Sequence, residues 1–231
     1  MTRLILILCL CILCLPFSAR AELYENAHRA NPQYEFMARR AFQVYPKEFD
    51  FMEFRAVYSE TRQYDPIGED TLARMDTLSY TVMTEKNTEK SGMALLEYRA
   101  LVADHLAHLG VVMKALTLAR QDKRFGNPDF FRWVKAGIMD TVMISGTGKS
   151  LREAYDVVTL PEETALLYTL NVKLLKADPR NEGMIWYNMD DVEDLRTKEH
   201  WTVFVNTTYP MRFLEEQQQA RSGPKLNIPR Q

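Results

Sequence analysis

The sequence predicts an α+β fold, in which antiparallel helical hairpins are followed by a small antiparallel sheet that packs on them. Apolar residues recur at helical spacing up to about residue 145, with short polar connections between the helices. Beyond that point, β-rich runs alternate with turn residues. No low-complexity linker divides residues 22–220, so a helical region (22–145) and a mixed strand and helix region (146–220) are expected to form one domain.

Residues 1–21 have the layout of a cleavable secretory signal peptide. Arg3 precedes an apolar run that is too short to span a bilayer, which needs roughly 20 apolar residues, and Ala19 and Ala21 suit a cleavage site. The alternatives are a lipoprotein anchor, which the bulky residues before each cysteine disfavour, and a retained anchor helix. We expect cleavage after Ala21, a periplasmic or secreted protein, and no stable membrane span after cleavage.

The composition of the mature chain excludes several classes of protein. All 3 cysteines lie within residues 1–21, so the mature chain would need no disulfide, zinc thiolate or cysteine nucleophile. Cleavage would leave 27 of the 29 basic residues against 31 acidic ones, a net charge of −4. Such a mild acidic balance offers no electrostatic footprint for nucleic acid or for an anionic membrane.

The first two helices are marked by their start and stop residues. Asn31 as a cap and Pro32 at the first helical position begin a helix that runs to about Val44. A second helix follows through residues 49–58, and the turn at residues 64–68 ends this unit. A short pair of helices is therefore expected to open the helical region.

Three or four further helices are expected before residue 145. One begins near Glu69, and the break at residues 124–128 precedes another from Asp129 to about Ile144. Between them, the apolar spacing over residues 93–116 fits either two helices, with Asp104 as the cap of the second, or one bent helix. Because the pattern has no fixed repeat, we expect helical hairpins but not a regular solenoid.

The rest of the chain is predicted to alternate strands and turns around one short helix. A β-rich run covers residues 154–160, and Pro161 starts a helix toward Tyr168. Further strands are expected over residues 171–176, 184–189 and 201–206. The charged stretch 190–200 is interpreted as a loop, and residues 221–231 as a flexible tail.

Residues 145–150, Ser-Gly-Thr-Gly-Lys-Ser, are similar to a nucleotide-binding P-loop but differ from it in two ways. A P-loop needs Gly six residues before its Lys, where this chain has Met143, and it follows a strand and opens a helix. Here the predicted order is helix, then strand. We interpret Gly146 and Gly148 as a sharp turn from the helices to the sheet and predict no bound nucleotide, since an exported protein would also lack ATP.

His105 and His108 lie three residues apart on a predicted helix, beside Asp104. Two histidines at this spacing can share a helix face and a metal ion. The chain has no HExxH pattern, and no third ligand clearly accompanies the pair. We therefore interpret the histidines as a partly buried polar pair, and predict no metal and no other cofactor.

Arg55, Tyr58, Tyr64 and Asp65 form a polar and aromatic group near the end of the second helix. Arg55 and Tyr58 are three residues apart, so they share a helix face, and Asp65 suits a turn before Pro66. The group is interpreted as a structural cap for this pair of helices. A ligand site is the alternative.

Two acidic groups could supply catalytic carboxylates. Glu162 and Glu163 follow Pro161, where negative charge stabilises the first turn of a helix. The second group, within residues 190–194, is interpreted as a solvated face without calcium-loop spacing. Glycosidase-type catalysis needs two carboxyls facing each other across a substrate, which adjacent residues do not show. A serine nucleophile would need a G-x-S-x-G elbow, and the sequence has none.

Several short motifs occur together between Phe49 and Phe204. They are Phe54-Arg55-x-x-Tyr58-Ser59-x-Thr61-x-x-Tyr64-Asp65-Pro66, Asp104-x-x-Ala107-His108, and Ser145-Gly146-x-Gly148-Lys149-Ser150 with Ala154-Tyr155-x-Val157-Val158 and Glu162-Glu163. In this combination the chain resembles the exported bacterial proteins grouped as domain of unknown function 4919. Tyr187 and the strand that holds Phe204 are similar to that family's last two strands.

The resemblance implies a tetratricopeptide-like helical part joined to a small sheet, export, and no established activity. It also favours a turn over a P-loop at Gly146. The chain departs from the family at Thr164, where Tyr is usual, and at Asn188, where Tyr is typically followed by Asp. If those family residues bind a ligand, this chain binds it differently.

The expected function is a non-enzymatic binding or protein-interaction module for an unknown protein or small ligand, because helical hairpins often present a concave face. The alternatives are an envelope hydrolase that uses Glu162 or Glu163 at the helix–sheet junction, and an envelope structural factor. The candidate functional or structural cluster is Arg55, Tyr58, Tyr64, Asp65, His108, Tyr155, Glu162, Glu163 and Tyr187.

Overall fold

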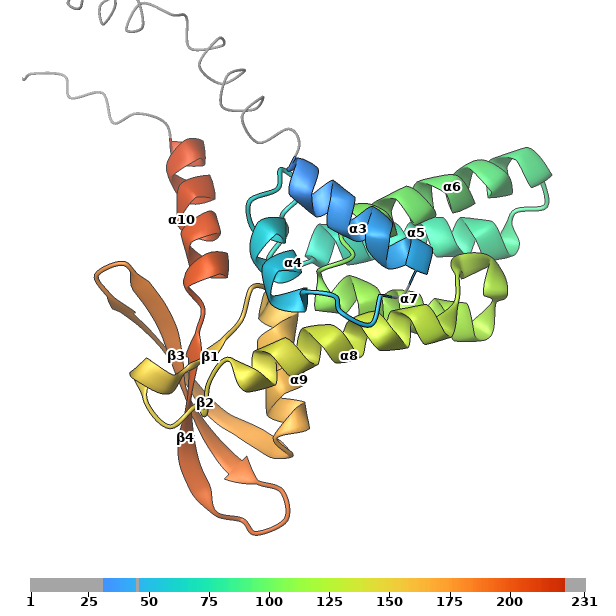
Figure 1. Cartoon of the computed structure of the whole chain (residues 1–231). Helices are drawn as coiled ribbons and strands as arrows, with labels where there is room; N and C mark the ends of the chain where they lie inside the picture. Colours follow the sequence, from blue (N-terminus) through green and yellow to red (C-terminus); the bar gives the residue numbers. More distant parts are fainter. Residues whose placement is uncertain (1–30, 45, 223–231) are drawn as a thin grey trace, which may run out of the picture.

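The computed structural model describes residues 31–44 and 46–222, and it confirms the α+β prediction. Helices occupy the first part of the described chain, and a sheet forms in its C-terminal part (Figure 1). The predicted signal peptide, residues 1–21, and most of the predicted tail, from residue 223, lie outside the described residues. Within the described residues, no helix is both long and apolar enough to cross a membrane.

Six helices form the first part, as the apolar spacing predicts. They are α3 (Pro32–Val44), α4 (Phe51–Tyr58), α5 (Glu69–Thr84), α6 (Thr88–Asp104), α7 (Leu109–Gln121) and α8 (Pro128–Ile144), with the 3-10 turn η1 (Lys123–Phe125) before α8. The short connections make α5 and α6 one hairpin and α7 and α8 another (Figure 1). Helices α3 and α4 lie across these hairpins. They pack on each other through Tyr34 of α3, whose ring stacks on that of Phe54 of α4 with the ring centres 5.1 Å apart.

The structure resolves the choice between two helices and one bent helix in favour of two. Asp104 is the last residue of α6, so the prediction that it caps the next helix is wrong. His108 is the cap instead, since its Nδ1 accepts a hydrogen bond of 3.2 Å from the backbone N–H of Val111. The second helix also begins later than expected, because Asp50 caps α4 and leaves Phe49 outside it.

Four strands of the described region form one sheet. They are β1 (Tyr155–Asp156), β2 (Val172–Glu182), β3 (Ile185–Asp194) and β4 (His200–Asn206), in the order β1-β4-β3-β2. Strands β2, β3 and β4 pair antiparallel as expected, whereas the two residues of β1 pair parallel with β4. The β-rich run 154–160 is therefore mostly not strand, because η2 (Leu151–Glu153) leads directly into β1 and Leu160 already begins α9 (Leu160–Thr169).

Strands β2 and β3 are longer than the sequence suggested. Pro179 was expected in a connection, yet it lies within β2 opposite Asn188. Proline is tolerated there because β2 is an edge strand, whose outer N–H groups need no partner. Residues 190–194 continue β3, so the predicted charged loop shortens to residues 195–199.

Helix α10 (Thr208–Ser222) was not predicted. It contains the Gln-rich residues 215–219 and the first two residues of the expected tail, Arg221 and Ser222. Glu, Gln and Arg are good helix formers, but a stretch this polar shows little apolar periodicity. Phe213 holds α10 against the helical region, because its ring packs edge to face on that of Tyr64 with the ring centres 5.0 Å apart. Figure 1 shows α10 rising from the sheet beside the helical region.

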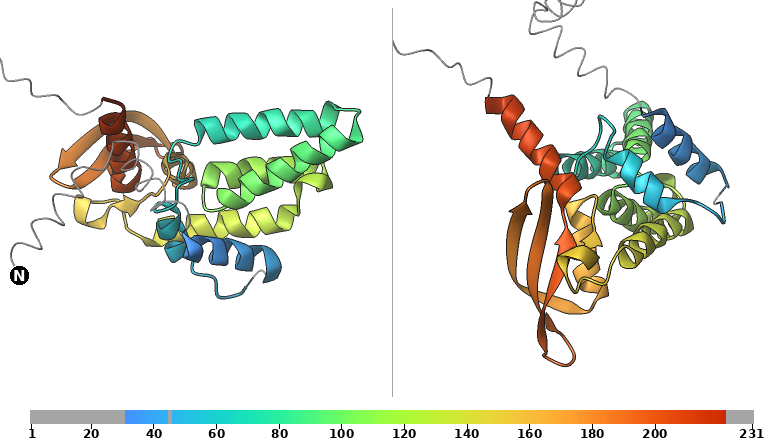
Figure 2. Two further views of the ribbon diagram at one scale, coloured as in Figure 1. Left: turned by 90° about the horizontal axis from the view of Figure 1, so that it is seen from above. Right: turned by 60° about the vertical axis from the view of Figure 1, so that its left-hand side comes forward.

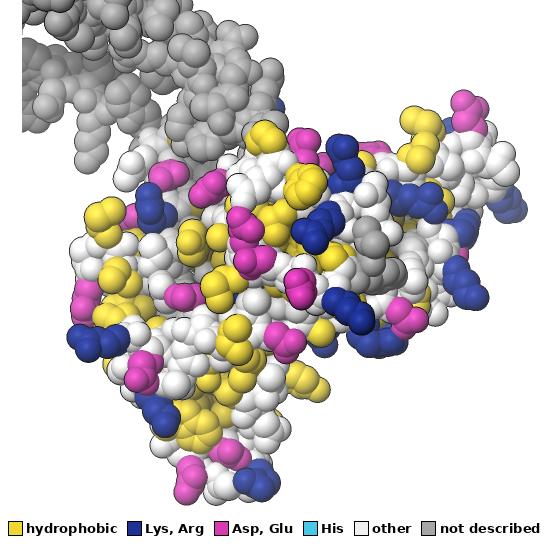
Figure 3. Space-filling view, viewed as in Figure 1, with side chains coloured by type: hydrophobic (Ala, Val, Ile, Leu, Met, Phe, Trp, Pro, Cys, Tyr) yellow, Lys and Arg dark blue, Asp and Glu magenta, His cyan; other side chains and the backbone are white. Residues whose placement is uncertain are grey.

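The protein has two hydrophobic cores that meet near α9. The larger core fills the helical region, and the smaller one lies between the sheet and α9, with Leu166, Val192 and Val203 fully or nearly fully buried. Figure 2 shows α9 between the sheet and the helices. On the face drawn in Figure 3, acidic and basic side chains are interspersed, so no single charge dominates that face.

Candidate functional site

A buried ion pair joins the helical region to the sheet region. Arg55 of α4 meets Glu162 of α9, with Nη2 to Oε2 at 2.6 Å and Nε to Oε1 at 3.2 Å. The two side chains are 4% and 0% exposed. This two-bonded geometry is the strongest that arginine makes with a carboxylate.

The remaining polar atoms of this pair also have partners. Arg55 donates from Nη1 to the hydroxyl of Thr141 at 3.1 Å and from Nη2 to the carbonyl of Asp156 at 2.8 Å. Glu162 Oε2 accepts the backbone N–H of Val158 at 2.8 Å. The pair therefore holds together α4, α8, β1 and α9, and it leaves Glu162 closed to a substrate.

A second polar group lies on the same side of the junction, around the turn before α5. Tyr64 donates to the carbonyl of Val158 at 2.5 Å, and the Tyr58 hydroxyl lies 2.8 Å from His105 Nδ1. Asp65 accepts hydrogen bonds from the Gly68 N–H at 2.8 Å and from the Thr71 hydroxyl at 2.7 Å. These contacts support the interpretation of a structural cap.

Burial sets the protonation of this second group. Loss of solvation lowers the pKa of His105 and of His108 to about 4, against the opposing effect of the Asp65 charge. Burial alone would raise the pKa of Asp65, but the hydrogen bonds from Thr71 and Gly68 lower it. Both histidines are therefore neutral at pH 7.

The histidine pair does not form part of a metal site among the described residues, where no three His, Cys, Asp or Glu side chains are grouped to hold an ion. His108 is fully buried under Gly68, which has φ +81°. A Cβ at Gly68 would lie 2.5 Å from the His108 ring, so only glycine fits. His108 is therefore a core residue that also caps α7.

Glu163 lies in different surroundings from its neighbour Glu162. Its Oε1 accepts a 2.6 Å hydrogen bond from Asn188 Nδ2, and its carboxyl lies close to that of Asp190 on β3. Asp190 is fully buried, and neither of its oxygens has a hydrogen-bond donor among the described residues. The prediction that Asp190 lies on a solvated face is therefore wrong.

The two carboxyls can bond to each other only when one of them holds a proton. Burial, the charge and hydrogen bonding of Glu163, and the nearby Asp191 raise the pKa of Asp190 to about 8. Asp190 is therefore protonated at pH 7, and it lies as a neutral carboxylic acid beside Glu163 between α9 and the sheet.

Tyr155 and Tyr187 do not join the polar groups described above. Tyr155 is buried beneath the turn at Gly148, where an added Cβ would lie 2.6 Å from its ring. Tyr187 donates to Glu182 Oε1 at 2.7 Å. Because side chains alternate along β3, Tyr187 faces away from Asp190. The predicted cluster thus divides into the ion-pair side, the carboxyl pair and two separate tyrosines.

The P-loop-like stretch is a turn. The backbone N–H groups of Thr147 and Gly148 both donate to the carbonyl of Glu153, at 2.9 and 2.7 Å. Gly148 has φ +68°, and a Cβ at Gly146 would lie 2.4 Å from that carbonyl oxygen. The N–H groups that would bind phosphate in a P-loop are thus used within the turn.

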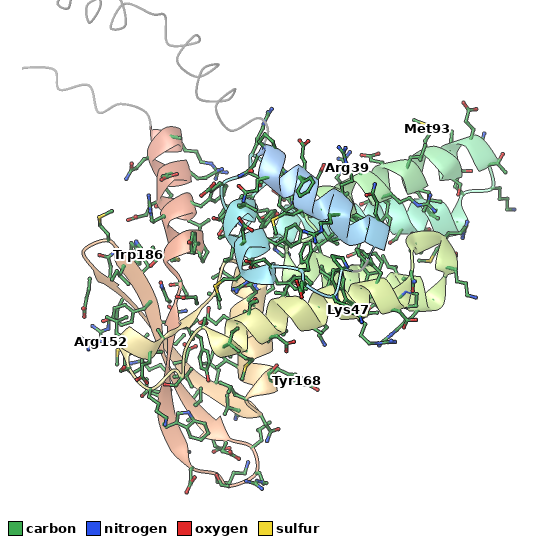
Figure 4. All side chains as sticks on the ribbon, viewed as in Figure 1. Arg39, Lys47, Met93, Arg152, Tyr168 and Trp186 are labelled. Atoms are coloured by element: carbon green, nitrogen blue, oxygen red, sulfur yellow. The ribbon has the colours of Figure 1, made fainter. Side chains whose placement is uncertain are left out.

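A mostly apolar groove, here called the α9 groove, was missed by the sequence analysis. It has a volume of about 820 Å³ and lies between α5, α7, α8 and α9. Exposed lining side chains include Ile67, Met113 and Tyr168, and Lys114 and Lys135 add positive charge. Figure 4 shows Tyr168 on the side of α9 away from the sheet.

One signal in the sequence could have revealed the α9 groove. Pro161, Thr164, Ala165 and Tyr168 are spaced i, i+3, i+4 and i+7, so they form one face of α9. Leu166 and Leu167 belong to the sheet core instead. A helix with apolar residues on two faces, one of them exposed, indicates a surface for another molecule.

Comparisons with protein families, curated proteins and solved structures find no match for the chain. The resemblance to domain of unknown function 4919 stays a prediction. Function is therefore inferred from the geometry of the molecule itself.

Proposed function

We propose that the protein is an exported, non-enzymatic binding module that holds an apolar segment of another protein in the α9 groove. The observation that carries the proposal is the groove itself, with Ile67 and Met113 about two-fifths exposed and Tyr168 85% exposed. Large apolar side chains gathered in one groove of an otherwise charged surface are typical of interaction sites.

The charge of the groove favours a partner segment that also carries an acidic side chain. Lys114 is paired with Asp76, whereas half-buried Lys135 makes no ion pair with a described residue. An Asp or Glu on the partner would pair with Lys135 in partly desolvated surroundings, where such a contact affects specificity. The bound segment would thus combine apolar anchors with at least one carboxylate.

Site-directed photocrosslinking in cells tests this proposal. A photoreactive residue at exposed Thr164 in the groove should give a discrete adduct, while the same residue at exposed Thr197 in the β3–β4 loop should not. Met113→Asp should abolish the adduct. Lys135→Glu should reduce its yield about fivefold or more, because like charges would meet, whereas Lys86→Glu outside the groove should have no effect.

Two results would contradict the binding proposal. One is the absence of an adduct at Thr164 in cells that export the protein. The other is an adduct whose yield is unchanged by Met113→Asp. Peptide mapping of the adduct provides the further check, since the crosslinked segment should contain apolar residues and an Asp or Glu.

The hydrolase alternative now depends on Glu163, because Glu162 is fully used in its ion pair. The observation in its favour is the carboxyl of Asp190, whose pKa is raised beside the carboxyl of Glu163, since such neighbouring carboxyls are typical of acid–base sites. Screening the purified protein against ester, peptide and glycoside substrates tests it. An activity lost in Glu163→Gln would support a hydrolase, and no activity in the wild type would reject it.

A further inference from the structure

A second pocket, here called the β4 pocket, lies beside the first half of strand β4. It has a volume of about 490 Å³ and opens between β4, the turn before η2 and the end of α9. Its principal lining residues are Lys149, Tyr155, Leu170, Trp201, Thr202 and Val203. The β4 pocket shares no lining residue with the α9 groove. Its occupant is therefore independent of the proposed groove partner.

The wall of the β4 pocket is largely apolar. Tyr155 and Val203 are buried, Leu170 is half-buried, and the large side chain of Trp201 is 39% exposed. Trp201 and Val203 are two positions apart on β4, so their side chains lie on the same face of the sheet. An aromatic ring left partly open beside buried apolar side chains is typical of a binding surface.

Strand β4 has an open backbone edge along this pocket. Strand β1 pairs with β4 only at Val205 and Asn206, and the Phe204 N–H donates to the Gly148 carbonyl at 2.9 Å. Because backbone groups alternate in direction along a strand, the N–H and carbonyl of Thr202 point the same way as those of Phe204, away from β3. Neither group of Thr202 has a hydrogen-bond partner in the part of the chain that the structure describes.

Lys149 adds a positive charge where this open edge ends. It directly follows Gly148, whose backbone occupies the edge at Phe204, so a strand added beside Thr202 would have to stop at this turn. Lys149 is exposed, and it makes no ion pair with a side chain of residues 31–44 or 46–222. The site thus combines unpaired backbone groups, an apolar wall and an unpaired cation at one end.

We propose that the β4 pocket binds the C-terminal end of a peptide chain of another protein, which adds to the open edge as a short strand parallel to β4. In this direction the peptide ends at the Gly148 turn, where its free carboxylate pairs with Lys149. The opposite direction would bring a positively charged N-terminus to Lys149, so the charge selects the parallel arrangement. Backbone bonds to the edge give affinity, and the pocket selects the side chain.

The geometry of a parallel strand specifies which part of the peptide makes each contact. The last N–H of the peptide donates to the Thr202 carbonyl, and the carbonyl of the third-last residue accepts the Thr202 N–H. The residue between them lies level with Thr202, so the last side chain points to the same face as Trp201 and Val203. The peptide should therefore end in an apolar residue such as Leu or Val.

Fluorescence polarisation with a labelled peptide pool tests the role of the carboxylate. The pool contains hexapeptides that end in Leu or Val, with mixed residues before them, and it is prepared both as the free acid and as the C-terminal amide. We expect the acid pool to bind the wild type about tenfold more tightly, the value of one hydrogen bond to a charged group. Lys149→Gln should remove this preference, whereas Lys176→Gln, on the far edge strand β2, should keep it.

The open edge of β4 has a test of its own. Thr202→Pro removes the outward N–H without removing a bond to β3, so it should weaken binding of the acid pool about tenfold or more. Thr202→Val keeps the N–H and should bind as the wild type does. Hydrogen exchange followed by NMR gives a readout on the unaltered protein. The Thr202 amide should exchange fast in the free protein and about tenfold or more slowly with the acid pool, while the Val203 amide, bonded to β3, stays protected throughout.

Several results would overturn the proposal. They are the absence of saturable binding, equal binding of the acid and amide pools, a preference that survives in Lys149→Gln, and a Thr202 amide whose exchange the acid pool does not slow. N-acetylleucine distinguishes a peptide from a small carboxylate, because it carries the last residue alone. It should bind at least about tenfold more weakly than the acid pool, and equal affinity would reject the added strand. None of these results bears on the α9 groove, so the two proposals can fail separately.

Discussion

Glu162 and Glu163 are neighbours in the first turn of α9, yet they experience opposite surroundings. Glu162 is fully buried against the guanidinium of Arg55, and every polar atom of that pair has a partner. Glu163 is half-buried and lies toward the sheet, where its carboxyl is close to that of Asp190. A single step along the helix thus separates a complete ion pair from two neighbouring carboxyls.

The comparison shows how burial acts on charge in this protein. At Glu162 the carboxylate faces the opposite charge of Arg55 and accepts three hydrogen bonds, which offset the loss of water. At Asp190 the pKa is raised, because the carboxyl is fully buried without a donor and lies beside the carboxyl of half-buried Glu163. The first site holds the junction together, and the second makes the sheet core sensitive to pH.

The largest expected effect comes from breaking the ion pair. Glu162→Gln should lower the free energy of unfolding by about 3–5 kcal/mol, because Arg55 would be left buried without a countercharge. Urea unfolding monitored by tryptophan fluorescence measures it. Glu97→Gln is the matched control, since its exposed pair with Arg74 should contribute about 0–1 kcal/mol. Equal effects of the two substitutions would contradict a stabilising role of the buried Arg55–Glu162 pair.

The next effect is a pH dependence of stability caused by Asp190. The folded protein keeps its proton up to about pH 8, whereas the unfolded chain loses it near the ordinary value of 3.8. The contribution of Asp190 to stability should therefore fall as pH rises between these values and level off above pH 8. His105 and His108 oppose it up to about pH 7, because their pKa values are lowered from 6.5 to about 4 in the fold. The slope is at most about 1.4 kcal/mol per pH unit for one proton.

Asp190→Asn should remove that slope, since Asn holds no titratable proton. The difference in stability between the wild type and Asp190→Asn from pH 6.5 to 8 isolates the effect, because the opposing contribution of His105 and His108, whose pKa values are lowered from 6.5 to about 4, is the same in both proteins. Urea midpoints at several pH values across this range provide the measurement. A wild type that loses no stability relative to Asp190→Asn from pH 6.5 to 8 would contradict a buried, protonated Asp190.

The smallest effect is expected from Glu163→Gln. Gln can still accept the hydrogen bond from Asn188, so stability at pH 6.5 should change by less than about 1 kcal/mol. The pKa of Asp190 should move down, because a negative neighbour is removed, and the pH slope should become shallower. The same pH series of urea midpoints measures both quantities, and an unchanged slope would mean that burial alone protonates Asp190.

The helices were readable from the sequence because their signals are local. Asn31 and Pro32 mark the start of α3, and the glycines at 146 and 148 predicted the turn that the structure has there. Both glutamates were also expected in the first turn of a helix, where they lie. Such features depend on residues a few positions apart.

The contacts that define the site are not local, and they could not be assigned from sequence. Arg55 and Glu162 are 107 residues apart, so their pairing depends on how α4 meets α9. Asp190 looked solvated because acidic residues surround it, although Val192 two positions later is the alternating apolar residue of a strand. Helix α10 gave no apolar period, and its position depends on long-range contacts, namely the packing of Phe213 on Tyr64 and the hydrogen bonds between Thr208 and Trp186.

Pro179 in strand β2 has a consequence for behaviour at high concentration. An exposed sheet edge can pair with the edge of a second molecule and begin aggregation. Proline offers no N–H to such a partner, and it lies in the middle of the edge strand, opposite Asn188. Lys173 and Lys176 add positive charge along the same strand. Proline and these lysines together disfavour pairing of this edge with a second molecule.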